Sequence, residues 1–200
     1  MAEAVAAPDQ RVESGLLPDA FNALDRRGWA VLDLGPASPA TVAFFNPYPC
    51  RVGFADAQGS LMDMARRWPM DPTLAWYELK EAVSVDPQRP WQLVLLWDLL
   101  DYLPGELLAR LMDRLAPGLA DGAYLHGFVT DGPQTVPDTP PIYQILGRDT
   151  LYRWVDPSAG RRSPPRYSPW HLQRHMPGTV QEASRQRRDG RQEHLLRFSR

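Results

Sequence analysis

Short apolar runs alternate with amphipathic segments along the first two thirds of the chain. The apolar runs have the length of buried strands and end in turn signals: 29–34, 51–55, 91–96 and 123–129. The amphipathic segments carry apolar residues at helical spacing: 16–27, 39–45, 59–68, 73–85 and 104–115. This alternation predicts an α/β fold, a doubly wound and mainly parallel sheet with helices on both faces.

The last third of the chain predicts a different ending to the sheet. Ser168 can cap a helix over 169–176. The dipeptide Asp189-Gly190 lies between two extended runs, 180–187 and 193–198, and an Asp-Gly in that position is a strong hairpin signal. The sequence therefore predicts an antiparallel C-terminal hairpin added to the parallel strands.

The same patterns divide the chain into segments. Residues 1–15 are small and polar without periodicity, and we expect a flexible N-terminal tail. Residues 16–200 are expected to form a single domain. Within it, 131–167 begins with a run rich in Pro, Thr and Asp and is interpreted as an inserted loop or lid over the ligand-binding edge of the sheet. Its aromatic residues either contact a ligand or pack the loop against the sheet.

Composition excludes several classes of protein. Apolar residues make up 44% of the chain, enough for a core, and no apolar run is long enough to span a bilayer. Met1–Ala7 carries Glu3 and lacks the basic region of a signal peptide, so a cytoplasmic protein without membrane contact is expected. Cys50 is the single cysteine, which excludes an internal disulfide. No metal site is predicted, because His171 and His175 share ligand spacing without a third ligand.

The net charge of -2 conceals an asymmetry between the two parts of the chain. Residues 1–147 hold 10 basic and 19 acidic side chains, a net of -9, whereas 148–200 hold 12 arginines and 5 acidic side chains, a net of +7. One interpretation is a basic face that engages an anionic partner, nucleic acid among the possibilities. The other is a set of solvated strands that balance an acidic body, and the sequence does not decide between them.

Three motifs occur in a fixed order. Val31-Leu-Asp-Leu-Gly35 ends the first predicted strand, and Asp56 ends the next one, 23 residues after Asp33. Val94-Leu-Leu-Trp-Asp-Leu-Leu-Asp-Tyr-Leu-Pro104 runs from a strand into a helix. The turn 114–118 then leads to Gly122-Ala-Tyr-Leu125.

In this order, and with the C-terminal hairpin, the motifs resemble class I S-adenosylmethionine-dependent methyltransferases over roughly residues 16–130 and 168–200. The resemblance implies S-adenosylmethionine as cofactor. It assigns cofactor contacts to Asp33, Gly35, Ala37, Asp56 and Asp98, with Asp56 in the position of an acid that accepts hydrogen bonds from ribose hydroxyls. An alternative role for Asp98 is the N-cap of the turn that follows it. Asp101 and Tyr102 are expected at the rim of the site.

The sequence departs from the family pattern in two places. The family loop reads Asp-x-Gly-x-Gly-x-Gly, but here the second glycine is Ala37 and the third is Pro39. Proline removes an N–H donor and fixes φ near -65°. In addition, 73–85 is predicted helical where the family has a short third strand, so no adenine-contacting residue is assigned.

Two functions follow from the resemblance. One is methyl transfer to an unidentified small molecule or partner group. No catalytic residue is assigned for it, because methyl transfer depends mainly on proximity and orientation. The other is a catalytically inactive methyltransferase-fold protein that engages an anionic partner through its Arg-rich C-terminal face. A dehydrogenase-type dinucleotide binder is disfavoured by the C-terminal hairpin and the missing third glycine.

Overall fold

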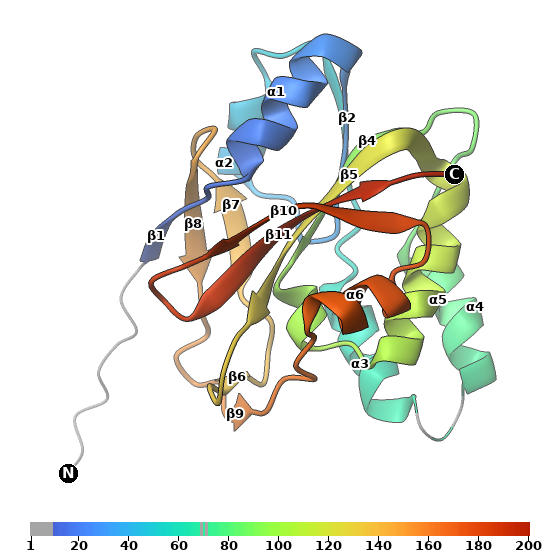
Figure 1. Cartoon of the computed structure of the whole chain (residues 1–200), viewed down its shortest axis with the longest axis vertical. Helices are drawn as coiled ribbons and strands as arrows, with labels where there is room; N and C mark the ends of the chain where they lie inside the picture. Colours follow the sequence, from blue (N-terminus) through green and yellow to red (C-terminus); the bar gives the residue numbers. More distant parts are fainter. Residues whose placement is uncertain (1–9, 69, 71) are drawn as a thin grey trace.

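The computed structural model describes residues 10–68, 70 and 72–200. Within these residues the main sheet has six strands in the order β10-β11-β5-β4-β2-β3 (Figure 1). Their bounds are β2 (Trp29–Asp33), β3 (Cys50–Phe54), β4 (Trp91–Trp97), β5 (Leu119–Thr130), β10 (Thr179–Gln186) and β11 (Arg191–Phe198). Strands β2 to β5 pair in parallel, whereas β11 pairs antiparallel with both β5 and β10. The predicted fold class is confirmed.

The helices lie close to their predicted bounds, and local signals explain where several begin and end. They are α1 (Leu17–Arg27), α2 (Pro39–Phe45), α3 (Gln58–Arg67), α4 (Pro72–Ala82), α5 (Gly105–Leu115), α6 (Pro169–His175) and the 3-10 helices η1 (Asp98–Asp101) and η2 (Ala116–Gly118). The Ser38 hydroxyl accepts a hydrogen bond from Thr41 N at 3.1 Å and begins α2. Gly28 ends α1 at φ +93°, a conformation that glycine adopts without strain.

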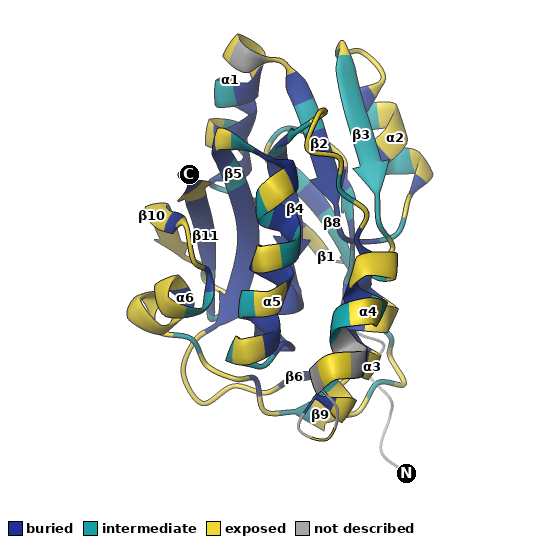
Figure 2. Ribbon diagram, turned by 90° about the vertical axis from the view of Figure 1, so that its right-hand side faces the viewer, coloured by how far each residue is buried: buried dark blue, intermediate teal, exposed yellow. Residues whose placement is uncertain are grey.

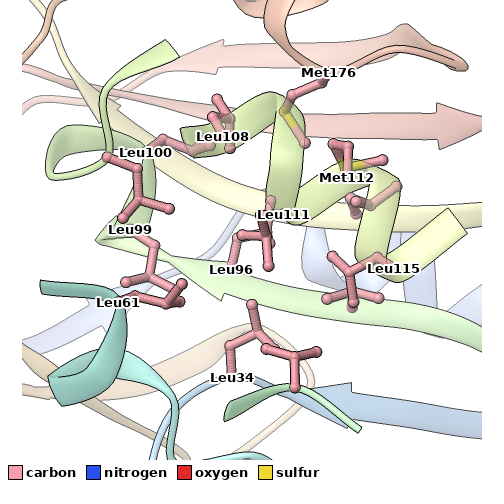
Figure 3. Packing of buried hydrophobic residues seen from close by; sticks show 14 of the residues in the cluster. Leu34, Leu61, Leu96, Leu99, Leu100, Leu108, Leu111, Met112, Leu115 and Met176 are labelled. Atoms are coloured by element: carbon pink, nitrogen blue, oxygen red, sulfur yellow. The ribbon is translucent and has the colours of Figure 1, made fainter. Parts of the chain in front are cut away.

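Apolar side chains cover both faces of the main sheet. On one face, Leu111 of α5 lies beside Leu96 of β4, in a cluster that also contains Leu108 and Leu115 (Figure 3). On the other face, Phe21 of α1 and neighbouring aromatic residues pack against β2 and β4. Figure 2 shows the resulting layers, with buried central strands and helices exposed on their outer surfaces. The described helices include none that is both long and apolar enough to cross a membrane.

Residues 10–15 contain a strand and make hydrogen bonds to the body of the molecule, so the predicted flexible tail is wrong for them. Strand β1 (Gln10–Glu13) pairs antiparallel with β8 (Thr150–Trp154). The Glu193 carboxylate accepts hydrogen bonds from the Ser14 hydroxyl and from Gly15 N at 2.9 Å and Leu16 N at 3.3 Å. A buried carboxylate thus satisfies backbone donors at the start of α1. The rest of the predicted tail, 1–9, lies outside the described residues.

Segment 131–167 contains strands where a loop was predicted. It carries β6 (Val136–Pro137), β7 (Ile142–Ile145), β8 and β9 (Arg161–Arg162). Strands β1, β8 and β7 form a second, three-stranded antiparallel sheet. Ile145 N donates to the Thr41 hydroxyl at 3.0 Å, which fastens β7 to α2. Its strands β7 and β8 therefore lie beside α2 in the three-stranded sheet, whereas β6 and β9 pair with each other.

Strand β3 is an edge of the main sheet, and α4 follows α3 directly in the chain. Within the described residues, no strand stands beyond β3 in the position of the family's third strand. The helix predicted over 73–85 is confirmed as α4.

Candidate functional site

The carboxyl ends of β2, β3 and β4 bring the predicted site residues to one edge of the sheet. Asp33 is the last residue of β2, Asp56 follows β3, and Asp98 follows β4. The loops are joined directly, because Asp56 N donates to Gly35 O at 3.2 Å. Open α/β sheets bind ligands at this edge.

Asp33 is almost completely buried, and the chain's own donors bind it. Its Oδ1 accepts hydrogen bonds from Gly35 N at 2.8 Å and from the Trp97 indole Nε1 at 2.6 Å. Burial raises the pKa of Asp33 to about 7, although both hydrogen bonds act in the opposite direction. The carboxyl group is therefore directed at Trp97 and Gly35.

Trp97, the last residue of β4, lies against Gly35 and Asp33. A Cβ atom built on Gly35 would come within 3.4 Å of the indole Cδ1 and Nε1, so the ring already packs against this glycine. The backbone of Trp97 has φ +53° and ψ -133°, which costs a residue with a side chain on the order of 1–3 kcal/mol. The β4–β5 register shifts at the same point. The sequence signal available for this residue was its place directly before Asp98 at the end of a strand.

Tyr143 of β7 lies on the other side of the Trp97 ring. The two rings are stacked, with centroids 4.8 Å apart and planes within 5°. Phe128 of β5 continues the stack, 5.5 Å from Tyr143. All three side chains are buried. We refer to Trp97 and Tyr143 together as the Trp97–Tyr143 stack.

Asp98 is the centre of a buried polar group that we call the Asp98 cluster, which comprises Asp98, Tyr143, Arg153 and Arg191. The Tyr143 hydroxyl donates to Asp98 Oδ1 at 2.7 Å and accepts from Arg153 Nε at 3.0 Å and from Arg191. Arg153 and Arg191 also form ion pairs with Asp98, at 3.3 and 3.4 Å. Burial, together with the Asp98 carboxylate, raises the pKa of the Tyr143 hydroxyl above its usual value. Since η1 has no side-chain cap, the N-cap alternative for Asp98 is wrong.

Asp101 and Tyr102 are buried, so their expected place at the rim is wrong. The Asp101 carboxyl accepts hydrogen bonds from Thr130 N at 2.8 Å and from the Thr130 hydroxyl at 2.6 Å. Burial, reinforced by the nearby Asp98 charge, raises the pKa of Asp101 to about 7. Asp101 therefore joins η1 to β5.

Ala37 and Asp56 form the outer part of the same edge, and both are exposed. Asp56 has φ +46°, a left-handed conformation that Asp tolerates better than most residues. Two cavities of the described part of the chain lie away from this edge. One of about 320 Å³ opens beside Gln92 and Tyr124 at the amino-terminal ends of β4 and β5. The other, of about 350 Å³, lies between α2 and β3.

Several arginines of the predicted basic face are engaged inside the molecule. Arg153 and Arg191 belong to the Asp98 cluster. Arg148 pairs with Asp25 at 2.9 Å, and Arg187 pairs with Asp189 at 3.3 Å. The positive charge of the last 53 residues is therefore partly neutralised by internal contacts. Arg174 lies over the exposed ring of Trp170 on α6 and keeps an outward position.

His171 and His175 have separate surroundings on α6. His171 Nδ1 lies 3.1 Å from the Ser168 hydroxyl, and His175 packs against Gly105. Among the described residues, no group of three or more His, Cys, Asp or Glu side chains has an arrangement that could hold a metal ion.

Comparison with known proteins identifies the fold through structure alone. No protein-family model matches the sequence, and no curated protein matches it. A S-adenosylmethionine-dependent methyltransferase from Clostridium acetobutylicum matches with a TM-score of 0.52 and 10% identity, over 94% of this chain and 93% of that one. The chain has the Rossmann-like methyltransferase fold.

Two further solved methyltransferases match less closely in three dimensions. The 1,6-didemethyltoxoflavin-N1-methyltransferase of Burkholderia thailandensis, with bound S-adenosylhomocysteine, has a TM-score of 0.46 and 16% identity over 94% of this chain and 80% of that chain. The N-methyltransferase NodS of Bradyrhizobium japonicum has a TM-score of 0.47 and 12% identity over 92% and 94%.

The residues at the carboxyl edge fit S-adenosylmethionine only in part. Exposed Ala37 and Asp56 leave the outer edge accessible. The inner edge does not fit, because Trp97 packs against Gly35 and its indole holds the Asp33 carboxyl group. The conformation described here therefore does not accommodate the complete cofactor.

Proposed function

We propose that this protein is a S-adenosylmethionine-dependent methyltransferase-like protein whose methyl acceptor is a small molecule or a group on a partner beneath segment 131–167. The observation that carries the proposal is the direct joining of the β2 and β3 loops, with Asp33, Gly35 and Asp56 at one carboxyl edge. The names of the structural neighbours support the same class of reaction.

Each residue has a limited role in this proposal. Exposed Asp56 is the acceptor for ribose hydroxyls, and the turn around Ala37 borders the cofactor. Asp33 and Gly35 line the inner part of the site once Trp97 has moved. S-adenosylmethionine, when bound, supplies an activated methyl group. We assign no catalytic base, because methyl transfer depends mainly on proximity and orientation.

The second candidate is a binding protein of the same fold that transfers no methyl group. It is favoured by a specific observation, the Trp97–Tyr143 stack in the inner site. In this case the exposed Trp170 and Arg174 on α6 are the more suitable part of the predicted basic face for an anionic partner, because Arg148, Arg153, Arg187 and Arg191 are engaged internally.

Calorimetric titration with S-adenosylmethionine and S-adenosylhomocysteine separates the two candidates. We expect saturable binding that Ala37→Arg weakens at least tenfold, because the new side chain crosses the exposed turn. Gln173→Arg is the matched control, since it adds the same charge at an exposed position on α6 and should leave binding unchanged. If neither the wild-type protein nor Tyr143→Ala gives heat or a thermal shift at millimolar ligand, the proposal fails and the binding protein is left.

A further inference from the structure

We propose that the Trp97–Tyr143 stack is autoinhibitory, closing the inner site to S-adenosylmethionine until β7 and β8 move away from the main sheet. The inference rests on the proposed function, because it concerns the regulation of the same site. The evidence consists of the contacts that the Trp97 and Tyr143 rings make and of the strands, β4 and β7, to which the two residues belong.

The first step concerns Trp97. Its indole donates to Asp33 at 2.6 Å and packs against Gly35, the two residues assigned to the inner cofactor contacts. Trp97 is fully buried, and its positive φ is a backbone conformation that residues other than glycine rarely adopt. A strained residue of this kind persists only where its surroundings hold it in place.

The second step concerns what holds Trp97. The Tyr143 ring covers the indole with nearly parallel planes. Tyr143 belongs to β7, which is part of the three-stranded sheet and not of the main sheet. Displacement of β7 and β8 therefore removes Tyr143 from the site without breaking a strand pairing of the main sheet.

The third step concerns the Asp98 cluster, which fixes Tyr143 at its hydroxyl end. Arg153 comes from β8 and Arg191 from β11, and both pair with Asp98 at the end of β4. The ion pairs join the small sheet to the main sheet at the cofactor edge. Movement of β7 and β8 away from the main sheet separates Arg153 and Tyr143 from Asp98, so the cluster opposes opening.

The chain leading into β7 also crosses this edge. Gln58 Nε2 donates to Pro141 O at 3.4 Å, and the Tyr102 hydroxyl donates to Thr139 O at 3.4 Å. These contacts place 139–141 above α3 and η1. The same segment that carries Tyr143 is therefore the cover of the site.

The consequence for binding is a population effect. A ligand that binds only the open form has an apparent Kd equal to its intrinsic Kd divided by the open fraction. Removing the Tyr143 ring raises the open fraction, so affinity should rise although a contact has been deleted. A side chain with only a structural role has no such effect.

The test is calorimetric titration of the full chain with S-adenosylhomocysteine. We expect Tyr143→Ala to bind at least tenfold more tightly than wild type. Tyr143→Phe keeps the stacked ring and loses the hydroxyl held by the Asp98 cluster, so its gain in affinity should lie between wild type and Tyr143→Ala. Leu111→Ala destabilises the opposite face of the sheet and should not increase affinity. Trp97→Ala is the second opening variant if Tyr143→Ala does not fold.

The outcomes distinguish this inference from the proposed function. Tighter binding by a folded opening variant supports both. If wild type binds saturably and the opening variants bind no more tightly, autoinhibition is overturned and the proposed function stands. If no folded form binds at millimolar ligand, both are overturned. Equal gains in Tyr143→Ala and Leu111→Ala also overturn autoinhibition, because general loosening then explains the effect.

Discussion

Trp97 and Asp33 show how a buried carboxyl group finds its donors within the chain. Burial alone raises the pKa of Asp33, and two hydrogen bonds partly offset that effect. The Trp97 Nε1 bond is the shorter of the two, at 2.6 Å against 2.8 Å for Gly35 N. A hydrogen bond to a charged acceptor in such a setting contributes more than one between neutral groups.

Trp97→Phe should therefore lower the free energy of unfolding by about 1–3 kcal/mol, because it deletes the donor and keeps an aromatic ring in the stack. The loss should be larger at pH 8, where Asp33 is mostly ionised, than at pH 5. Urea denaturation followed by circular dichroism measures both values.

Trp170→Phe is the control, because Trp170 is 63% exposed. It should change stability by less than about 0.5 kcal/mol. Equal losses for the two variants, or a loss at position 97 that does not depend on pH, would contradict the assigned role of the indole.

The sequence predicted that three aspartates lie at one edge of the sheet, but it did not predict which side chains surround them. Asp33, Asp56 and Asp98 follow strands, and the ends of parallel strands meet at one edge, so their proximity was predictable. The second sheet, which no local sequence pattern predicted, brings together four further residues: Trp97, Tyr143, Arg153 and Arg191. Arg153 was therefore read as part of a surface, although β7–β8 pairing places it opposite Tyr143.

At the scale of elements, local signals account for most boundaries. Ser38 caps α2, and Ser168 caps α6 and Asp189-Gly190 turns the hairpin as predicted. Strand β1 was missed because it has four residues and depends on β8 for its pairing. Val12 is buried between the exposed Arg11 and Glu13, and this alternation is too short to distinguish a strand from a tail.

Strand β8 in turn depends on β1, because β8 is the central strand of the small sheet, with β1 on one side and β7 on the other. Val12→Asn places a polar side chain in the core beneath the small sheet and should loosen all three strands. We expect amide hydrogen exchange in β7 and β8 to accelerate at least tenfold, whereas exchange in β4 stays unchanged.

Arg11→Asn is the matched control in the same strand, because Arg11 is exposed. It should leave exchange in β7 and β8 near the wild-type rate. Acceleration spread evenly over β4, β7 and β8 would show that the small sheet does not open separately, and would weaken the case for movement of Tyr143 as well.

At the scale of the whole molecule, buried titratable groups set the pH dependence of stability. Asp33 and Asp101 have pKa values raised to about 7 from 3.8 in the unfolded chain, mainly by burial. Burial lowers the pKa of His194 to about 4 from 6.5. Glu193 differs, because hydrogen bonds from His126, Ser14 and Gly15 outweigh burial and lower its pKa to about 2 from 4.5.

The signs of these shifts determine the direction of each contribution. Between pH 7 and about 4.5 the folded chain holds two protons, on Asp33 and Asp101, that the unfolded chain lacks. The unfolded chain in turn holds one, on His194, so the folded state has a net excess of one proton (2 - 1). The free energy of unfolding should then rise by up to about 1.4 kcal/mol for each pH unit of acidification.

Below about pH 4.5 the rise ends, because the unfolded chain then holds protons on both His194 and Glu193 and the excess falls to zero (2 - 2). The direction reverses below the pKa of 3.8 of the unfolded aspartates. Glu193 stabilises the fold above its unfolded pKa of 4.5, and this contribution is lost as pH falls toward 2. We therefore expect maximum stability between about pH 4 and pH 5, measured as the urea midpoint across pH 3 to 9. A maximum at or above pH 7 would contradict the burial of neutral Asp33 and Asp101.

Two neutral replacements assign the two limbs of this curve to their residues. Asp101→Asn keeps an oxygen acceptor for Thr130 N and cannot ionise, so it should remove most of the decline between pH 5 and pH 8. Glu193→Gln removes the ionised acceptor at the start of α1, so it should lower stability near neutral pH and flatten the limb below pH 4.5. The two side chains titrate in different pH ranges. If Asp101→Asn changed the limb below pH 4.5, or Glu193→Gln changed the decline between pH 5 and pH 8, the assignment of these limbs to these residues would be wrong. Asp101 joins η1 to β5 and lies close to Asp98 in the chain. The pH dependence of stability therefore also measures how strongly η1 is held at the edge of the candidate site.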